Sequence, residues 1–282
     1  MSEQGGEPWL SAPARIVRVM DPDLFHAALF AREPGRERLM VLYAFDIELS
    51  RAAETPSEPL IARMRLQFWR GVLEGARAGE TPRQHEVAEP LHRLIAEQDL
   101  PAEDLGAMVE AREIELEGNM DEARFAAWLG GRFGALTRLA TRLLGGPANP
   151  AQEAASEAGQ AIGMGFALRT AAPMAAAGTR TLVPGLDGED LAALARGRTT
   201  GRAREVARAM AERGLASLAA ARAERPAVPR LATPAFLPAW RAERILKRAR
   251  RPSLDMVADL ARERDDPARG LSLAWRALSG RW

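Results

Sequence analysis

The sequence predicts an all-α protein, a single-domain helical bundle with about ten helices and no sheet. Ala, Leu, Arg and Glu dominate the chain, and β-branched residues are sparse outside short patches. Apolar residues recur at helical spacing, and helix-start signals divide the long helical stretches. With 282 residues, 47% of them hydrophobic and 27% charged, the chain is large enough to bury a sizeable core.

Three short segments carry helix-start signals. Thr55-Pro56-Ser57-Glu58 places a capping residue type, an early proline and a third-position glutamate in the expected order. Thr81-Pro82-Arg83-Gln84 repeats the signal, and Asn149-Pro150-Ala151-Gln152 is a near variant. We expect a long helix to begin at each of the three.

The segment after the first signal has an apolar stripe typical of one helix face. Its members are Leu60, Met64, Phe68 and Val72 at four-residue steps, widened by Ile61, Trp69 and Leu73. Further along, Gly145-Gly146-Pro147 ends a helix that begins near Asp121. Residues 182–188 are expected to form a loop, and Gly163-Met164-Gly165 indicates close helix packing rather than a nucleotide-binding loop.

The proline-rich stretch 226–238 has the composition of a linker, but its Leu and Phe content favours a packed connection. Helices are expected near 239–250 and 254–279. We therefore predict one domain over 21–282, preceded by a flexible tail over 1–20.

The last twelve residues combine aromatic side chains with arginine. Leu271, Trp275 and Leu278 are expected to form the final core stripe, with Trp282 exposed. The alternative is that this segment meets a membrane surface or a groove on a partner protein.

Charge and composition exclude several classes of protein. The net charge of +1 argues against a nucleic-acid binder, which normally has a basic excess on one face. The absence of cysteine excludes disulfides and thiolate chemistry. The N-terminus has no signal-peptide core, and no apolar stretch approaches the roughly 20 residues that cross a bilayer. We expect a cytoplasmic protein whose contact with the inner face of the membrane, if any, is peripheral.

The stretch from Gly35 to Arg70 resembles the first signature of the squalene/phytoene synthase family. Arg36 and Tyr43-Ala44-Phe45 stand in register with that signature. The positions of the family's aspartate cluster hold Ser50, Arg51 and Glu54 instead.

The stretch from Phe166 to Pro184 resembles the second signature of the same family. Arg169 and Arg180 match family arginines, whereas the aspartate positions hold Thr170 and Met174. In the family these aspartates hold the Mg²⁺ ions that assist diphosphate departure. The resemblance therefore implies the helical fold of the isoprenoid synthases without their metal-binding acids, and we expect no cofactor.

A third segment, Met108 to Leu116, resembles another helix of the family and keeps acids at Glu110 and Glu115. The resemblance then implies a residual pocket for a diphosphate or another ligand. Its candidate residues are Arg36, Tyr43, Glu54, Glu110, Arg169 and Arg180. In the alternative interpretation, these arginines pack their stems and pair with Glu110, Glu113 or Glu115 in a structural network.

Two other sets of residues have part of the spacing of a metal site. Asp46, Ser50 and Glu54 lie at successive four-residue steps. Two carboxylates with a hydroxyl between them are, however, a poor set of ligands for several Mg²⁺ ions. Of the three histidines, only His85 and His92 share a helical face, and without a third ligand they indicate surface or capping groups rather than zinc ligands.

One subgroup of the family matches better than the enzymes. Ala44 to Ser50 and Met64 to Trp69 resemble tracts of the phytoene-synthase-like assembly factors of respiratory NADH dehydrogenase. The resemblance implies a non-catalytic protein with a respiratory-complex subunit as partner. The alternatives are a Mg²⁺-dependent head-to-head prenyltransferase using Asp46, Glu54, Glu110 and Glu115, and a binding protein for an isoprenoid or another lipid.

Overall fold

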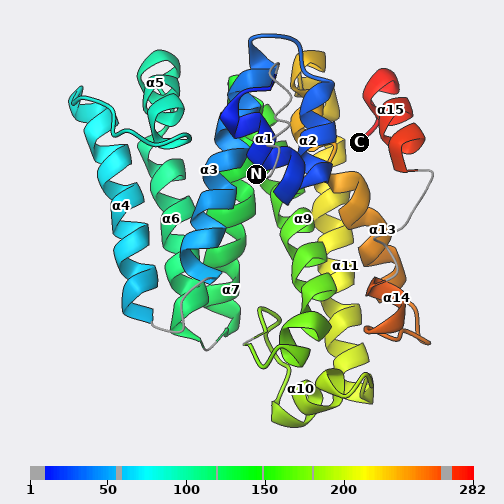
Figure 1. Ribbon diagram of the computed structural model, residues 1–282. Coiled ribbons are helices and arrows are strands. Elements are labelled where there is room, and N and C mark those ends of the chain that lie inside the picture. Colours follow the sequence, from blue (N-terminus) through cyan, green and yellow to red (C-terminus); the bar gives the residue numbers. More distant parts are fainter. Residues whose placement is uncertain (1–9, 55–58, 119, 148, 180, 262–268) are drawn as a thin grey trace, which may run out of the picture.

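The computed structural model describes residues 10–54, 59–118, 120–147, 149–179, 181–261 and 269–282. These residues form helices, turns and loops, with no strand among them, so the predicted all-α class is confirmed (Figure 1). The segments are α1 (Ala12–Met20), α2 (Pro22–Leu29), α3 (Gly35–Glu54), α4 (Pro59–Ala78), α5 (Ala88–Gln98), α6 (Ala102–Glu117), α7 (Glu122–Trp128), the π-helix η1 (Leu129–Gly134), α8 (Ala135–Leu143), α9 (Asn149–Ala176), α10 (Gly188–Ala195), α11 (Gly201–Ala223), the 3₁₀-helices η2 (Arg225–Ala227) and η3 (Arg230–Ala232), α12 (Thr233–Phe236), α13 (Ala239–Ala249), α14 (Ala258–Ala261) and α15 (Arg269–Ser279).

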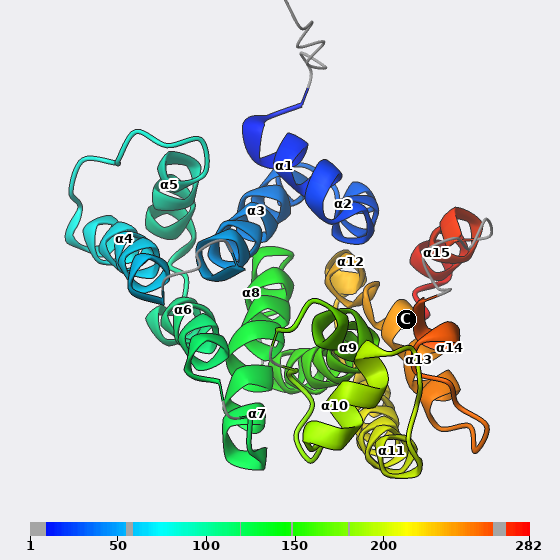
Figure 2. The same ribbon diagram turned by 60° about the horizontal axis from the view of Figure 1, so that its bottom comes forward.

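Helix α9 lies at the centre of the bundle and packs against α8, η1, α11 and α13 (Figure 2). Its buried side is made of small residues such as Ala154, Ala158 and Ala161, which allow neighbouring helices to approach closely. On the other side of α8, helices α3, α4 and α6 pack against one another. The site described below lies where α3, α6, η1 and α9 meet.

The π-helix η1 is clamped between α6 and α9. A β-carbon added to Gly131 would lie 2.5 Å from the carbonyl oxygen of Ala107, and one added to Gly159 would lie 2.5 Å from that of Phe133. Only glycine permits both backbone contacts. The two glycines therefore fix Arg132 and Phe133 in the interior of the bundle.

Several predicted boundaries are confirmed. The helical run α7–η1–α8 begins after the cap Asp121 and ends at Leu143, just before Gly145, whose φ is +88°. Helix α9 begins at Asn149, and residues 182–187 connect to α10. The stretch 226–238 is a packed connection, in which Phe236 and Leu237 are fully buried.

Other expectations were wrong. The tail does not extend to residue 20, because Ser11 caps α1 and Val17 packs into the core. The signal at Thr81–Gln84 does not start a helix; α5 begins at Ala88, where the His85 ring accepts hydrogen bonds from the backbone N–H groups of Val87 and Ala88. The signal at Thr55–Glu58 lies outside the described residues.

The expected helix over 254–279 does not begin at residue 254. Residues 251–257 form turns, α14 begins at Ala258, and α15 begins at Arg269. Asp255 stabilises these turns by accepting hydrogen bonds from the backbone N–H groups of Val257 and Ala258. The first helix of this stretch therefore begins four residues later than predicted.

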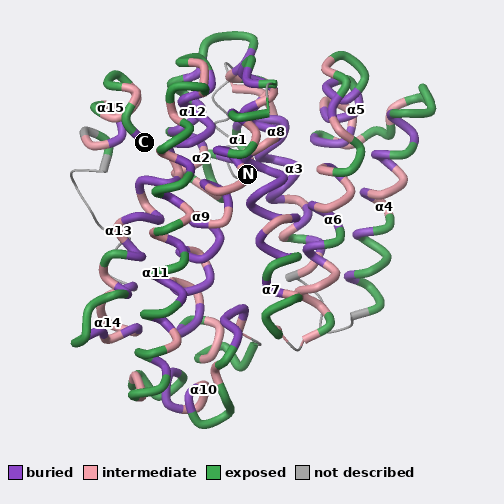
Figure 3. Tube along the Cα trace, turned by 180° about the vertical axis from the view of Figure 1, so that it is seen from behind, coloured by how far each residue is buried: buried purple, intermediate pink, exposed green. Residues whose placement is uncertain are grey.

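The apolar stripe on α4 is only partly buried. On α4, Leu60 and Met64 are 67% and 66% exposed, whereas Leu66, Trp69 and Val72 carry the burial. The outer face of α4 is correspondingly exposed along its length (Figure 3).

No helix in the described part of the chain is both long enough and apolar enough to span a membrane.

The C-terminal expectation was also wrong. Trp275 and Leu278 are exposed, while Trp282 is buried and stacks on Phe236 with ring centroids 4.3 Å apart. Helix α15 turns Leu273 and Ala277 inward instead. The side chain of Leu271 lies outside the described part.

Candidate functional site

Two hollows lie on either side of Arg132 and Phe166. The inner cavity, of about 110 Å³, is bordered by α2, α3, η1, α9 and α13. The second hollow is a cleft of about 630 Å³ bordered by α6, α9 and residues 178–179 and 181–182. Both are bordered by Arg132 and Phe166, so these two side chains form the wall between them.

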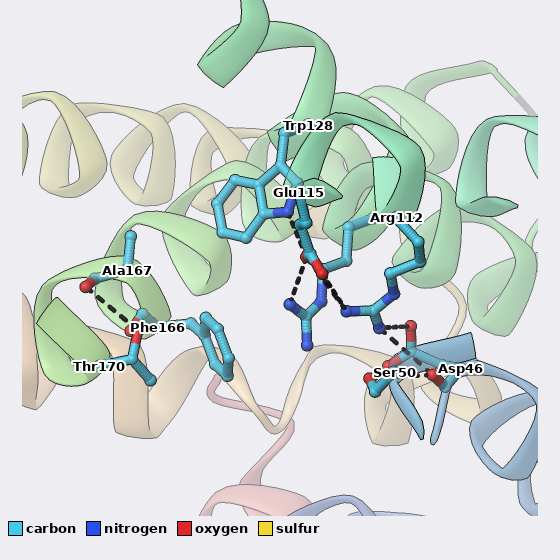
Figure 4. A network of polar contacts seen from close by, with 9 residues as sticks. Asp46, Ser50, Arg112, Glu115, Trp128, Phe166, Ala167 and Thr170 are labelled. Carbon is cyan, nitrogen blue, oxygen red and sulfur yellow. Dashed lines mark hydrogen bonds and ion pairs between the residues drawn. The ribbon is translucent and has the colours of Figure 1, made fainter. Parts of the chain in front are cut away.

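Arg112 is the centre of a buried ionic network. It projects from α6, is 0% exposed, and its Nη2 donates to the Asp46 carboxylate at 2.7 Å and to the Asp46 carbonyl oxygen at 3.2 Å. Its Nη1 lies 3.2 Å from Glu115 Oε1. Arg112 therefore bridges an acid of α3 to an acid of its own helix (Figure 4).

Glu115 connects this pair to η1. Its Oε1 accepts hydrogen bonds from Trp128 Nε1 at 2.6 Å and from Arg132 Nη1 at 2.8 Å. Burial alone raises the pKa of a carboxyl, but the guanidinium groups of Arg112 and Arg132 reverse that effect and lower the pKa of Glu115. Glu115 is therefore an ionised acceptor held from three sides.

Arg132 is further fixed by aromatic rings. Its guanidinium carbon lies 4.4 Å from the ring centroid of Phe166 and 4.9 Å from that of Phe133. Such contacts are favourable because a cation is attracted to the negative face of a ring. The wall between the two hollows is thus held by ionic and aromatic contacts.

The charges of this network cancel. Asp46 and Glu115 supply two negative charges, and Arg112 and Arg132 supply two positive ones. The cations that neutralise these buried acids are therefore part of the protein chain. A carboxylate already bound by guanidinium groups is a poor ligand for Mg²⁺, which requires several free oxygens in octahedral geometry.

The residues at the family's aspartate positions also do not fit a metal site. Ser50 donates its hydroxyl to the carbonyl oxygen of Asp46, and Thr170 donates to that of Phe166 at 2.9 Å, so both bond back to their own helices. Arg51 pairs with Glu48 at 2.7 Å, and Met174 borders the cleft with a thioether. In the described residues there is no group of three or more His, Asp or Glu side chains arranged to hold a metal.

Of the four candidate pocket residues whose side chains the structure describes, two lie together. Tyr43 and Arg169 both border the inner cavity, where Tyr43 is 1% exposed and burial raises its pKa. Arg36 instead lies at the start of α3, donates to the Ala31 carbonyl oxygen and pairs with Glu33. Glu110 is exposed on the outer side of α6.

The other two candidates cannot be placed. Glu54 ends α3, and its side chain is outside the described part, as is the whole of Arg180. Two acids of the alternative interpretation do form ion pairs, and the described partners are other arginines than the ones it named. Glu113 pairs with Arg70 at 2.7 Å, and Glu115 pairs with Arg112 and Arg132.

A second polar group borders the inner cavity. Asp21 caps α2 by accepting hydrogen bonds from the backbone N–H groups of Asp23 and Leu24, both at 3.1 Å. Burial raises its pKa, an effect opposed by the Leu24 N–H and by the charges of Arg241 and Arg169. Asp23 and Arg241, which both border the cavity, form an ion pair.

Sequence reasoning missed Arg112 and Arg132, although a signal for the first was present. Leu105, Met108 and Arg112 share one face of α6 at helical spacing, and the first two are core residues. An arginine on an apolar stripe predicts a buried partner. The identity of that partner, Asp46, was not encoded by any local pattern.

The fold and the site define a class. The protein is an all-helical bundle of the isoprenoid synthase type whose central polar site is neutralised by arginine. The squalene/phytoene synthase family model matches residues 17–273, and the chain belongs to that family.

The curated relatives are assembly factors. The human protein named NADH dehydrogenase (ubiquinone) complex I, assembly factor 6, is 28% identical over 252 residues, covering 86% of this chain and 74% of its own. The mouse protein of the same name is 26% identical over 254 residues, with the same coverage of the two chains.

The structural relatives are synthases. Squalene synthase HpnC from Alicyclobacillus acidocaldarius superposes with a TM-score of 0.72 at 21% identity, covering 83% of this chain and 90% of its own. A dehydrosqualene synthase in complex with ligand gives a TM-score of 0.80 at 12% identity, covering 95% and 94%. At these identities the likeness establishes the fold.

Proposed function

We propose that this protein is a non-catalytic member of the family that assists assembly of the respiratory NADH dehydrogenase. The observation that carries the non-catalytic part is the pairing of Asp46 and Glu115 with Arg112 and Arg132. Names of the curated relatives support the assembly part. Its partner is then a subunit of that complex, met in the cytoplasm or at the inner face of the membrane.

The enzyme alternative requires Asp46, Glu54, Glu110 and Glu115 to gather around Mg²⁺. Glu110 is exposed on α6, and Asp46 and Glu115 are already bound by guanidinium groups. The three of these acids whose side chains the structure describes therefore do not fit a magnesium cluster.

Two experiments test the two parts separately. Calorimetric titration with a non-hydrolysable farnesyl diphosphate analogue should give no Mg²⁺-dependent binding, and farnesyl diphosphate should release no diphosphate. Mg²⁺-dependent diphosphate release by the purified protein would overturn the non-catalytic assignment.

The assembly role is tested in the organism that encodes the protein. Deleting the gene should lower NADH:quinone oxidoreductase activity in isolated membranes and the amount of intact complex on native gels, with succinate oxidation as the unaffected control. Reintroducing the wild-type gene should restore both the activity and the amount of intact complex. Unchanged NADH oxidation in the deletion strain would remove the assembly role.

A second candidate function is suggested by the cleft beside Arg132. Its border includes the apolar side chains of Ile114, Leu116, Met120, Met174 and Leu182, which suit an isoprenoid or another lipid chain. We propose metal-independent binding there. Mass spectrometry of lipids extracted from the purified protein should find one bound species, and an extract no richer in lipid than that of an unrelated control protein would exclude a carrier.

A further inference from the structure

Cations outnumber acids where α11, α13 and α15 meet. Glu243 of α13 lies 2.7 Å from Arg222 Nη2, 2.8 Å from Lys247 Nζ and 3.6 Å from Arg276 Nη2. One carboxylate thus faces three cations from three parts of the chain. Together these contacts lower its pKa to about 2, the hydrogen bond from Arg222 being the largest cause.

Two more arginines extend this group. Burial and the charges of Arg222, Arg281 and Arg276 lower the pKa of Arg225. Arg222 and Arg225 both donate to the main-chain oxygen of Trp282, at 2.8 and 3.0 Å. The five cations therefore outnumber Glu243, the acid that these contacts name, and leave positive charge in excess among the named groups.

The same helix exposes large apolar side chains. Trp275 is 57% exposed and Leu278 is 84% exposed, one helical turn apart on α15. Arg281 lies over the Trp275 ring, 5.8 Å from its centroid. Opposite them, Leu273 packs against Ala27, Leu237 and Trp240, so the helix is anchored while its outer face remains uncovered.

This combination indicates a phospholipid surface. Tryptophan with arginine is typical of interfacial helices, because the indole lies at headgroup depth and the guanidinium meets phosphate. Trp275 and Leu278 border none of the described cavities and project outward, as insertion into a soft headgroup layer requires. Anionic lipids would supply the missing negative charge.

We propose that α15 and the five surrounding cations form a docking site for an anionic phospholipid membrane. Trp275 and Leu278 insert at the interface, and Arg225, Arg276 and Arg281 meet the lipid phosphates. Helix α15 lies at the opposite end of the bundle from α10, so docking leaves the α10 end facing away from the lipid (Figure 1). The proposal gives a surface to the peripheral membrane contact but does not depend on the assembly role.

Vesicle flotation with the full chain tests the site. The wild type should bind vesicles containing phosphatidylglycerol at least about tenfold more tightly than pure phosphatidylcholine vesicles. Binding should weaken as salt shortens the screening length from about 10 Å at 0.1 M to about 3 Å at 1 M.

Surface variants identify the side chains responsible. Trp275→Ser/Leu278→Ser should lower binding at least about tenfold, because two interfacial apolar groups are lost, and Arg281→Gln should lower it about threefold. The matched control is Leu60→Ser/Met64→Ser on α4, which removes two apolar side chains of similar exposure elsewhere and should bind as the wild type does. Circular dichroism verifies that all variants are folded.

Several results would overturn the proposal. These are no vesicle binding by the wild type, equal binding to both vesicle types, and a loss of binding in the α4 control variant equal to that in the α15 variant. Full displacement by millimolar inorganic phosphate would indicate an ion site only, and an acidic protein captured without vesicle binding would indicate a protein surface. Because the assay contains no respiratory complex, each failure leaves the assembly role to its own test.

Discussion

Removing Arg112 should cost much more stability than removing Arg112 and Asp46 together. In Arg112→Met, Asp46 loses its guanidinium partner at 2.7 Å while remaining only 8% exposed. Glu115 keeps Arg132 and Trp128, so one carboxylate is left without its partner. An unpaired buried charge costs about 3 to 5 kcal/mol, and we expect the single variant to lose about that much.

The double variant Arg112→Met/Asp46→Leu should lose only about 0 to 2 kcal/mol. The pair itself contributes little net stability, because both groups are desolvated and Arg112 Nε has no hydrogen-bond partner among the described residues. Urea denaturation of the wild type, both single variants and the double variant completes the cycle. A single-variant loss below about 1 kcal/mol, or additive losses in the double variant, would refute the buried ion pair.

Three further predictions concern packing and pH, each checked by urea denaturation. Gly159→Ala should destabilise the protein by about 1 to 3 kcal/mol, because its β-carbon would meet the Phe133 backbone, whereas Gly106→Ala on α6 meets nothing within 4 Å and should stabilise by about 0.5 to 1 kcal/mol; equal effects would contradict the clamped π-helix. Trp282→Ala should cost about 3 to 5 kcal/mol, since the side chain is 1% exposed, and a neutral result would place it at the surface. Since the pKa of Glu243 falls from 4.5 to about 2 on folding, its ionised form stabilises the fold above about pH 4.5, and this contribution is lost as the pH falls through 2. The stability difference between the wild type and Glu243→Gln, about 2 kcal/mol at pH 7, should therefore vanish near pH 2, and a difference independent of pH would exclude the ionic contribution.

The existence of the helices was predictable, because the local spacing of apolar residues determines it. The residues at which the helices begin and end were less predictable. The signal at Thr81–Gln84 has the residue types of a cap, yet α5 starts at Ala88 because His85 caps it and tertiary contacts bury Val87 and Ala88. The stripe on α4 was correctly helical. Which of its side chains are buried depends on how α3, α5 and α6 pack against α4, and the sequence of α4 alone does not determine that packing.

The absence of the family's acidic side chains from the candidate site was predictable. The sequence alone showed Ser50 and Thr170 at positions where the family has aspartates, and both hydroxyls bond to their own helices. It did not show that Glu110 points outward while Glu115, five residues later, points inward. A five-residue step turns an α-helix by about 500°, so the two acids lie on different faces.

The sequence by itself determined that the chain is helical, which family it resembles and which acids are missing, because these depend on residue identity and short-range spacing. Only the tertiary structure decided that Arg112 meets Asp46, 66 positions away, and that Arg132 closes the wall with Phe166. It also decided that Trp282 is buried while Trp275 is exposed. Ion pairing and burial depend on how distant helices pack, and no local pattern encodes that packing.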